Sequence, residues 1–308
     1  MVETSAVFNS IVSLFLIMIV GVIGRRRKII TPEANKGMIE VLLRIMLPLM
    51  IVSSFSFSYD DGIKANVFKT FYLSFIAYII IVGVSLLLTK PIKDERRAIL
   101  HFANVFTNTG FLGFPILNVI YGPEAVVYGS IFNVFFVLFL WTYGIMIFKG
   151  KMTKEELKKE IFKALLNPSI IAVCIGVAMM VLNLKFPEVI YNSIRAVGSM
   201  NGPLSMIIVG AIFANVNIKS HLKDWTIYYG ILMKMVIIPG ILYIISLVIN
   251  EKSIVINTII MLGSMPSAAM APIFAENFNF KKDYATIIMV VTTLVSLVTI
   301  PLLLKIIL

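Results

Sequence analysis

An apolar segment in the first half of the chain contains the sequence Asn108-Thr109-Gly110-Phe111-Leu112-Gly113-Phe114-Pro115-Ile116. A second apolar segment, about half the chain further on, contains Gly263-Ser264-Met265-Pro266-Ser267-Ala268-Ala269-Met270-Ala271-Pro272-Ile273. Proline removes a backbone donor and clashes with the preceding helical turn, and glycine lowers helix propensity. We therefore expect a broken helix at each of these two positions.

The composition is that of an integral membrane protein. Of the 308 residues, 59% are hydrophobic and 14% are charged, and the mean hydropathy is +0.96. These values lie outside the range of soluble domains. A helix of about 20 apolar residues crosses a bilayer, and ten windows qualify: 6–24, 40–58, 70–89, 98–120, 125–148, 164–183, 189–215, 225–249, 254–275 and 285–304. The sequence therefore predicts an all-α membrane protein with ten transmembrane helices in the lipid bilayer.

The basic residues predict the orientation of these helices. Lysine and arginine concentrate in cytoplasmic loops. With the N-terminus outside, 19 of the 27 basic residues fall in inner loops and 6 in outer ones. We expect a multi-pass protein of the plasma membrane with both termini outside. Because topology accounts for the net charge of +11, the charge does not indicate a nucleic-acid partner.

The chain divides into two halves with five predicted helices each. The most polar connection, residues 149–163, separates them, and an odd number of helices inverts the second half in the membrane. Two dipeptides recur about half a chain apart: Pro48-Leu49 with Pro203-Leu204, and Pro115-Ile116 with Pro272-Ile273. We predict two inverted five-helix repeats, 1–150 and 151–308, whose broken helices 4 and 9 cross at mid-depth. Matched broken helices are typical of the substrate site of a secondary transporter.

Charged residues inside the predicted helices favour an anionic substrate. All acidic residues lie outside the ten windows apart from Glu40, whereas Lys234 falls near mid-depth. A lysine there either binds a carboxylate or exchanges a proton, or it extends its charged end toward the inner surface, and the sequence leaves these interpretations open. Arg44 is close to the inner end of its window, so the second interpretation is preferred for it.

The candidate site combines the two interruptions with this lysine. His101, Asn104 and Asn108 are spaced to share one helical face, on which His101 is expected to be structural. The predicted substrate-binding residues are Asn108, Thr109, Gly110, Gly113, Pro115, Lys234, Ser264, Pro266 and Ser267. Asn104 and Glu276 are candidates for a coupling-ion site, with H⁺ and Na⁺ both open. We expect no metal site and no cofactor.

Several short motifs resemble those of the auxin efflux carrier family, whose fold is related to that of the bile acid sodium symporters. They are Asn-x-Gly-x-x-Gly-x-Pro at Asn108 to Pro115, Met265-Pro266 with Ala268, Leu47-Pro48, and Asn167-Pro168. The resemblance implies an elevator carrier, with helices 1, 2, 6 and 7 as scaffold and helices 3–5 and 8–10 as transport domain. It also implies organic anions as substrates, such as malonate or malate in prokaryotes and auxin in plants.

The leading hypothesis is thus a secondary active transporter of a small organic anion, a mono- or dicarboxylate. The alternatives are a membrane-embedded ligand sensor or receptor, and an ion-coupled carrier of a non-anionic solute. An enzyme is not expected, because the windows contain no acid/base pair and the chain has no Walker loop, HExxH or GxSxG motif. A homodimer is left open as the oligomeric state.

Overall fold

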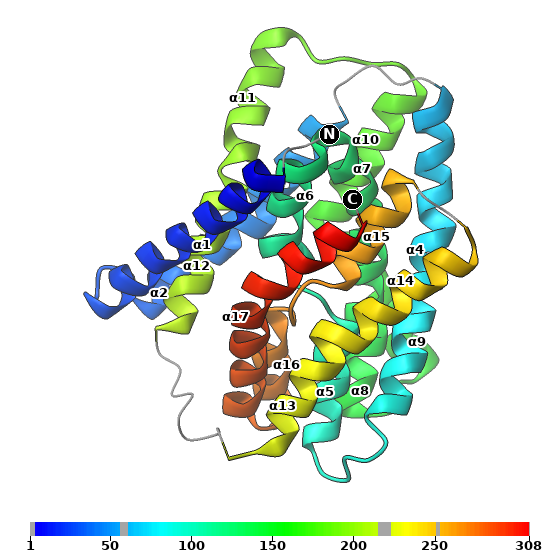
Figure 1. Cartoon of the computed structure of the whole chain (residues 1–308). Helices are drawn as coiled ribbons and strands as arrows, with labels where there is room; N and C mark the ends of the chain where they lie inside the picture. Colours follow the sequence, from blue (N-terminus) through cyan, green and yellow to red (C-terminus); the bar gives the residue numbers. More distant parts are fainter. Residues whose placement is uncertain (1–3, 56–60, 215–222, 251–252, 308) are drawn as a thin grey trace. The chain divides into compact units, whose positions relative to one another are not determined.

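The computed structural model describes residues 4–55, 61–214, 223–250 and 253–307 (Figure 1). This part of the chain is helical and contains no strand apart from an isolated bridge between Thr107 and Ser267. The described residues of each of the ten predicted windows fall on one continuous helical segment or on two helices with a short break between them. The all-α prediction is confirmed. Lys219, one of the 19 basic residues counted in the predicted inner loops, lies outside the described residues.

Six of the described helical segments are long and apolar enough to cross a membrane: Pro32–Ser54, Gly62–Leu88, Pro123–Lys149, Glu188–Phe213, Trp225–Val248 and Lys282–Ile307. Lys154–Leu165 and Pro168–Val181 form a further candidate pair, bent by 59°. Thr109–Tyr121 and Ile254–Gly263 are apolar but shorter. These two short helices belong to the two interrupted segments, so the interruptions shorten helices that would otherwise be long enough to span.

The chain forms two compact units. Unit 1 comprises residues 1–72, 110–137 and 164–214, and unit 2 comprises residues 73–109, 138–163 and 215–308. Unit 1 contains α1 (Thr4–Arg26), α2 (Pro32–Val41), η1 (Leu42–Met46), α3 (Leu47–Ser54), most of η2 (Thr109–Gly113), α6 (Phe114–Tyr121), α10 (Pro168–Val181), α11 (Glu188–Ser199) and α12 (Asn201–Phe213). The η segments are π-helical turns.

Unit 2 contains α5 (Arg96–Val105), η3 (Leu140–Gly144), α8 (Ile145–Lys149), α13 (Trp225–Leu232), η5 (Met233–Ile237), α14 (Ile238–Val248), α15 (Ile254–Gly263), α16 (Met270–Asn277) and α17 (Lys282–Ile307). Four elements contribute residues to both units: α4 (Asp61–Leu88), α7 (Pro123–Phe139), α9 (Lys154–Leu165), and η2, whose Thr109 lies in unit 2.

Glycines bring α1 and α12 together within unit 1, where the two helices lie side by side (Figure 1). A Cβ atom on Gly21 would lie 2.1 Å from the carbonyl oxygen of Ile207, and one on Gly210 would lie 2.0 Å from that of Met18. Small residues allow such close approach of helix backbones, which strengthens van der Waals packing where lipid supplies no hydrophobic drive. The glycines therefore specify this helix pair.

An apolar core holds the helices of unit 2 around α17. Its fully buried members include Ile99 and Leu100 of α5, Met233 of η5, and Ala285 of α17. Gly230 of α13 belongs to the same region, because a Cβ atom there would lie 2.5 Å from a methyl group of Leu100. This packing fixes α5, η5 and α17 relative to one another, and these elements carry the polar groups described below.

Both interrupted segments are broken, but the first break lies further upstream than the sequence suggests. Helix α5 ends at Val105, and helical structure resumes at Thr109 in η2. Pro115 is the second residue of α6, which continues η2 without a gap, so the proline lies within a helical segment and does not mark the break. The expected shared face of Asn104 and Asn108 is therefore wrong, because Asn108 lies beyond the end of the helix. The second break covers residues 264–269.

Candidate functional site

The two breaks meet in unit 2 through main-chain hydrogen bonds. The N–H group of Asn108 donates to the carbonyl of Pro266 over 2.8 Å, and that of Ala268 donates to Phe106 over 2.9 Å. These bonds flank the bridge between Thr107 and Ser267. Backbone groups outside a helix must find partners at membrane depth. Here each break supplies the partners of the other, so the two chain segments cross as a short antiparallel pair.

Lys234 lies beside this crossing and has no solvent exposure. Its Nζ donates a hydrogen bond of 2.9 Å to the main-chain carbonyl of Asn104, in the last turn of α5. The C-terminal end of a helix carries partial negative charge, which favours a cation. The sequence left open whether Lys234 points inward or toward the surface, and the structure places it inward. Arg44, in contrast, is exposed.

Three buried side-chain oxygens near the crossing have no hydrogen-bond partner in the described structure: Asn104 Oδ1, Thr107 Oγ1 and Ser267 Oγ. The amide nitrogen of Asn104 contacts only the sulfur of Met233, at 3.7 Å. Buried polar groups are normally satisfied, and exceptions call for an explanation such as a bound ligand. Hydroxyl groups donate as well as accept, so Thr107 and Ser267 are suited to hydrogen-bond an anion.

Other predicted residues in unit 2 support the crossing with their backbone or line a neighbouring cavity. Thr109 is buried, and its N–H group donates to the carbonyl of Thr107 over 2.9 Å. Ser264 caps the end of α15 and lines a cavity of about 290 Å³. The walls of that cavity are mostly apolar and include Pro239 and Ile300. Helix α16 begins directly after the break, so its positive N-terminal end faces the interruption.

Gly110, Gly113 and Pro115 belong to unit 1, where the structure places them with α12. Because Pro115 has no N–H group, the carbonyl of Phe111, four residues earlier, loses its helical donor. Ser205 supplies a replacement, its hydroxyl donating to Phe111 O over 2.6 Å. The amide of Asn201 donates to the carbonyl of Gly110 over 3.4 Å.

Glu276 is not gathered with the other candidates. It is exposed near the end of α16 and forms an ion pair of 2.7 Å with Lys282. The residues of the crossing are buried, whereas Glu276 is exposed, and none of the contacts described for Glu276 reaches the crossing.

Sequence reasoning missed four residues that complete these arrangements: Thr107, Asn201, Ser205 and Thr292. The hydroxyl of Thr292, on α17, accepts a hydrogen bond of 3.2 Å from Ser267 N. The sequence Asn201-Gly202-Pro203-Leu204-Ser205 contained a signal, because polar residues and a proline interrupt an apolar window there. No sequence signal marked Thr107 or Thr292, since threonine is common in membrane helices and the partners of these two residues are remote in sequence.

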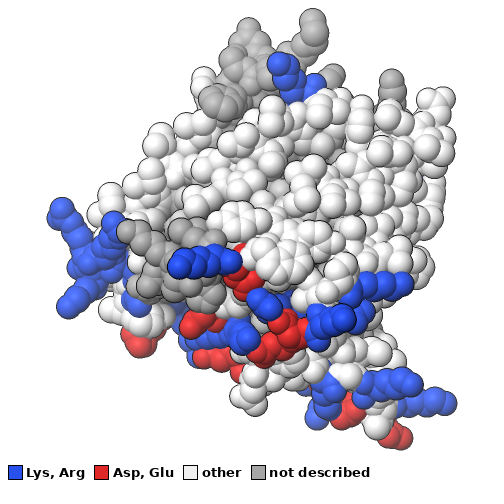
Figure 2. All heavy atoms as spheres, turned by 60° about the horizontal axis from the view of Figure 1, so that its bottom comes forward, with Lys and Arg blue, Asp and Glu red and all other residues white. Residues whose placement is uncertain are grey.

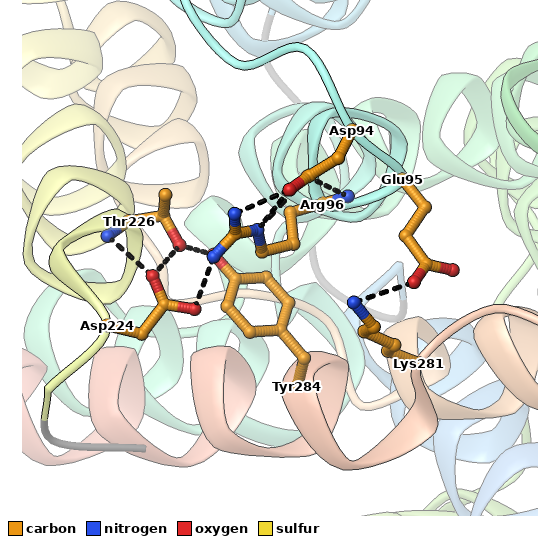
Figure 3. Close-up of polar contacts among 7 residues, drawn as sticks. All are labelled: Asp94, Glu95, Arg96, Asp224, Thr226, Lys281 and Tyr284. Carbon is orange, nitrogen blue, oxygen red and sulfur yellow. Dashed lines mark hydrogen bonds and ion pairs between the residues drawn. The ribbon is translucent and has the colours of Figure 1, made fainter.

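A second polar cluster in unit 2 joins the N-terminal ends of α5, α13 and α17 (Figure 3). Arg96 pairs with Asp94 and, over 2.7 Å, with Asp224. Asp224 also accepts hydrogen bonds from Thr226, which contacts the hydroxyl of Tyr284 at 2.7 Å. Acidic and basic side chains lie close together on the surface shown in Figure 2. From the sequence, these charged residues were interpreted only as indicators of the orientation of the helices in the membrane.

The pairing lowers the pKa values of both acidic groups. The hydrogen bond from the Arg96 side chain is the main reason why the pKa of Asp94 lies below its usual range. For Asp224, burial is the largest effect and raises the pKa, but hydrogen bonds from Thr226 and Arg96 together outweigh it and the net pKa is lowered. Both carboxylates are therefore ionised at neutral pH, and the cluster ties three helix ends together.

The family model described as "Membrane transport protein" matches residues 6–304, and the chain belongs to this family. The resemblance to the auxin efflux carrier family is thereby confirmed. The chain is 24% identical to an uncharacterized transporter of Methanocaldococcus jannaschii, over 93% of this chain and 94% of the relative. It is 22% identical to an uncharacterized transporter of Methanothermobacter thermautotrophicus, over 96% of each chain.

Proposed function

We propose that this membrane transport protein is a secondary active carrier of a small organic anion, a mono- or dicarboxylate. The carboxylate would bind at the crossing of the two broken segments, between the side chain of Lys234 and the hydroxyl groups of Thr107 and Ser267. Asn104, Asn108 and the N-terminal end of α16 would complete the site. An organic anion fits these groups because all of them donate hydrogen bonds or carry positive charge.

The observation that carries the proposal is that Lys234 is fully buried and has a single hydrogen-bond acceptor among the described residues. An ammonium group has three donors, and the described structure gives this one a single acceptor, the carbonyl of Asn104. Burial of a cation costs several kcal/mol unless a counter-charge and further hydrogen bonds compensate it. The described residues bring no carboxylate to Lys234, and a substrate carboxylate would supply the missing charge.

Alternating access is proposed by analogy with the family. The proposed carrier has ten transmembrane helices in two inverted repeats, residues 1–150 and 151–308, with both termini on the outer side of the plasma membrane. By analogy with the family, it would be a carrier of the elevator type. Helices 3–5 and 8–10 of that scheme would move with the substrate. Neutralisation of Lys234 by the bound anion would lower the cost of moving the site through the bilayer. The coupling ion, H⁺ or Na⁺, is part of this proposal, as is a homodimer.

A flux experiment tests the proposal. Purified protein in proteoliposomes should take up a labelled mono- or dicarboxylate, and excess unlabelled acid should compete. Parallel measurements with and without a Na⁺ gradient and a pH gradient would identify the coupling ion. A ligand sensor on the same fold would bind the acid without flux. Uptake of cations or neutral solutes without competition by any organic acid would exclude the anion carrier.

A further inference from the structure

A second cavity in unit 2 lies where α4 and α8 end and α5 begins. Its volume is about 390 Å³. Apolar side chains form much of its wall, among them Leu86 of α4 and Met146 and Ile147 of α8. Two cations also line it, Arg97 of α5 and Lys151 just beyond α8. The cavity therefore combines an apolar wall with positive charge.

These two cations have no carboxylate partner among the described residues. Nearby basic residues have carboxylate partners: Arg96 pairs with Asp94 and Asp224, and Lys281 pairs with Glu95 over 2.8 Å (Figure 3). Lys149 pairs with Glu156 over 2.6 Å. Within the ranges that the structure describes, neither Arg97 nor Lys151 forms an ion pair. The excess positive charge in this cavity is available to a ligand.

Part of the cavity lining is a set of hydrogen-bonded polar side chains around His101. His101 is 4% exposed and lies between Ser85 and Tyr143. Its Nδ1 is 2.7 Å from the Ser85 hydroxyl and its Nε2 is 2.8 Å from the Tyr143 hydroxyl. Both ring nitrogens therefore have partners, and the imidazole holds Tyr143 in place. A ligand here meets a fixed surface, because Tyr143 lines the same cavity as the two cations.

The cavity adjoins an exposed apolar surface of α4. Leu86 lines it and is 40% exposed, and the neighbouring Leu87 is 62% exposed. An occupant can therefore lie partly in the cavity and partly along the apolar side of the helix. A small hydrophilic anion would gain nothing from this apolar wall, whereas an amphiphile would bury its chain against it.

We propose that this cavity binds an anionic phospholipid. The acidic headgroup would lie between Arg97 and Lys151, and the first part of an acyl chain would pack on Leu86, Met146 and Ile147. Basic pockets between transmembrane helices are suited to such headgroups. The site is separate from the proposed substrate site and would make unit 2 sensitive to the composition of the membrane.

Native mass spectrometry of the detergent-solubilised full chain tests this proposal with phosphatidylglycerol as the probe. We expect one tightly bound phosphatidylglycerol, with phosphatidylcholine retained much less. The double variant Arg97→Gln/Lys151→Gln should bind phosphatidylglycerol about tenfold more weakly or worse. The matched control Lys158→Gln/Lys159→Gln removes the same charge from exposed positions of α9 outside the cavity and should change binding little.

A third variant, Met146→Trp, keeps both charges and fills the apolar wall, and it should also weaken phosphatidylglycerol binding. Unfolding temperatures of all variants establish that they are folded. Equal loss of binding in the two double variants would show general charge attraction and overturn the site. Competition by inorganic phosphate or glycerol phosphate as strong as that by the whole lipid would overturn the lipid in favour of a free anion.

Discussion

The ammonium group of Lys234 donates a hydrogen bond of 2.9 Å to the main-chain carbonyl of Asn104. This contact joins η5 to the last turn of α5, just before the break at which the two interrupted segments cross. A single side chain thus stabilises the end of a half-helix and places an amino group at the crossing. The predictions below follow from this arrangement and from the packing around it.

Replacement of Lys234 by methionine should abolish anion transport while the protein stays folded. Asn104 loses a donor, but a buried charge is removed as well, so the free energy of unfolding should change by no more than about 2 kcal/mol. An added carboxylate should raise the unfolding temperature of the original protein. In the Lys234→Met variant, both this rise and the uptake should disappear. Arg44→Met, at an exposed position, is the control. Equal loss of uptake in both variants would count against the site.

The hydroxyl of Ser205 should matter only because Pro115 is present. Ser205→Ala leaves Phe111 O without its donor and should cost about 1–3 kcal/mol. Pro115→Ala restores an N–H group four residues after Phe111, so Ser205→Ala should cost less in that background. A double-mutant cycle on thermal or denaturant unfolding measures the coupling, expected at about 0.5–3 kcal/mol. Strictly additive effects would disprove the compensation.

Close packing of α1 on α12 should make Gly210→Ala strongly destabilising. The added methyl group would lie 2.0 Å from Met18 O, so the helices must separate, at about 2–3 kcal/mol or more. Gly83→Ala is the matched control, since no atom lies within 4 Å of a Cβ added there. It should leave stability unchanged or raise it by up to about 1 kcal/mol. Similar unfolding temperatures for the two variants would contradict the close contact.

Acid should weaken the cluster around Arg96. The pKa of Asp224 is lowered in the folded protein, because hydrogen bonds from Thr226 and Arg96 outweigh the opposing effect of burial. Asp224 therefore stabilises the folded protein at pH values above its pKa in the unfolded chain, about 3.9. This stabilisation is lost as the pH falls through the lower pKa that Asp224 has in the folded protein. Asp224→Asn should flatten the fall of unfolding temperature below about pH 4. Asp283→Asn, at an exposed position, should keep the slope of the original chain.

The topology can be tested by labelling single cysteines. Cys174 is exposed and must first be replaced by alanine. Lys154→Cys and Lys185→Cys introduce cysteines at exposed positions on α9 and between α10 and α11. In the predicted arrangement Lys154 is inside and Lys185 outside, so an impermeant reagent should label them from opposite sides of intact cells or vesicles. Labelling from the same side would reject the arrangement.

The sequence by itself determined the class of the protein and the two segments that matter most. Apolar windows of membrane-spanning length and a biased distribution of lysine and arginine are properties of the chain that need no long-range contact to be read. Proline and glycine marked both interruptions, because their effect on a helix is local. Lys234 was also visible, as a cation in an apolar window.

Only the tertiary structure decided where the first break lies and which groups it satisfies. Pro115 lies within the helical segment formed by η2 and α6, and α5 ends ten residues before it, at Val105. Thr107 and Thr292 took on roles through partners that are distant in the chain, Ser267 in both cases. Hydrogen-bond partners and burial depend on how helices pack, and a local pattern of residues does not encode that packing. For the same reason the inward position of Lys234 became known only from its contact with Asn104.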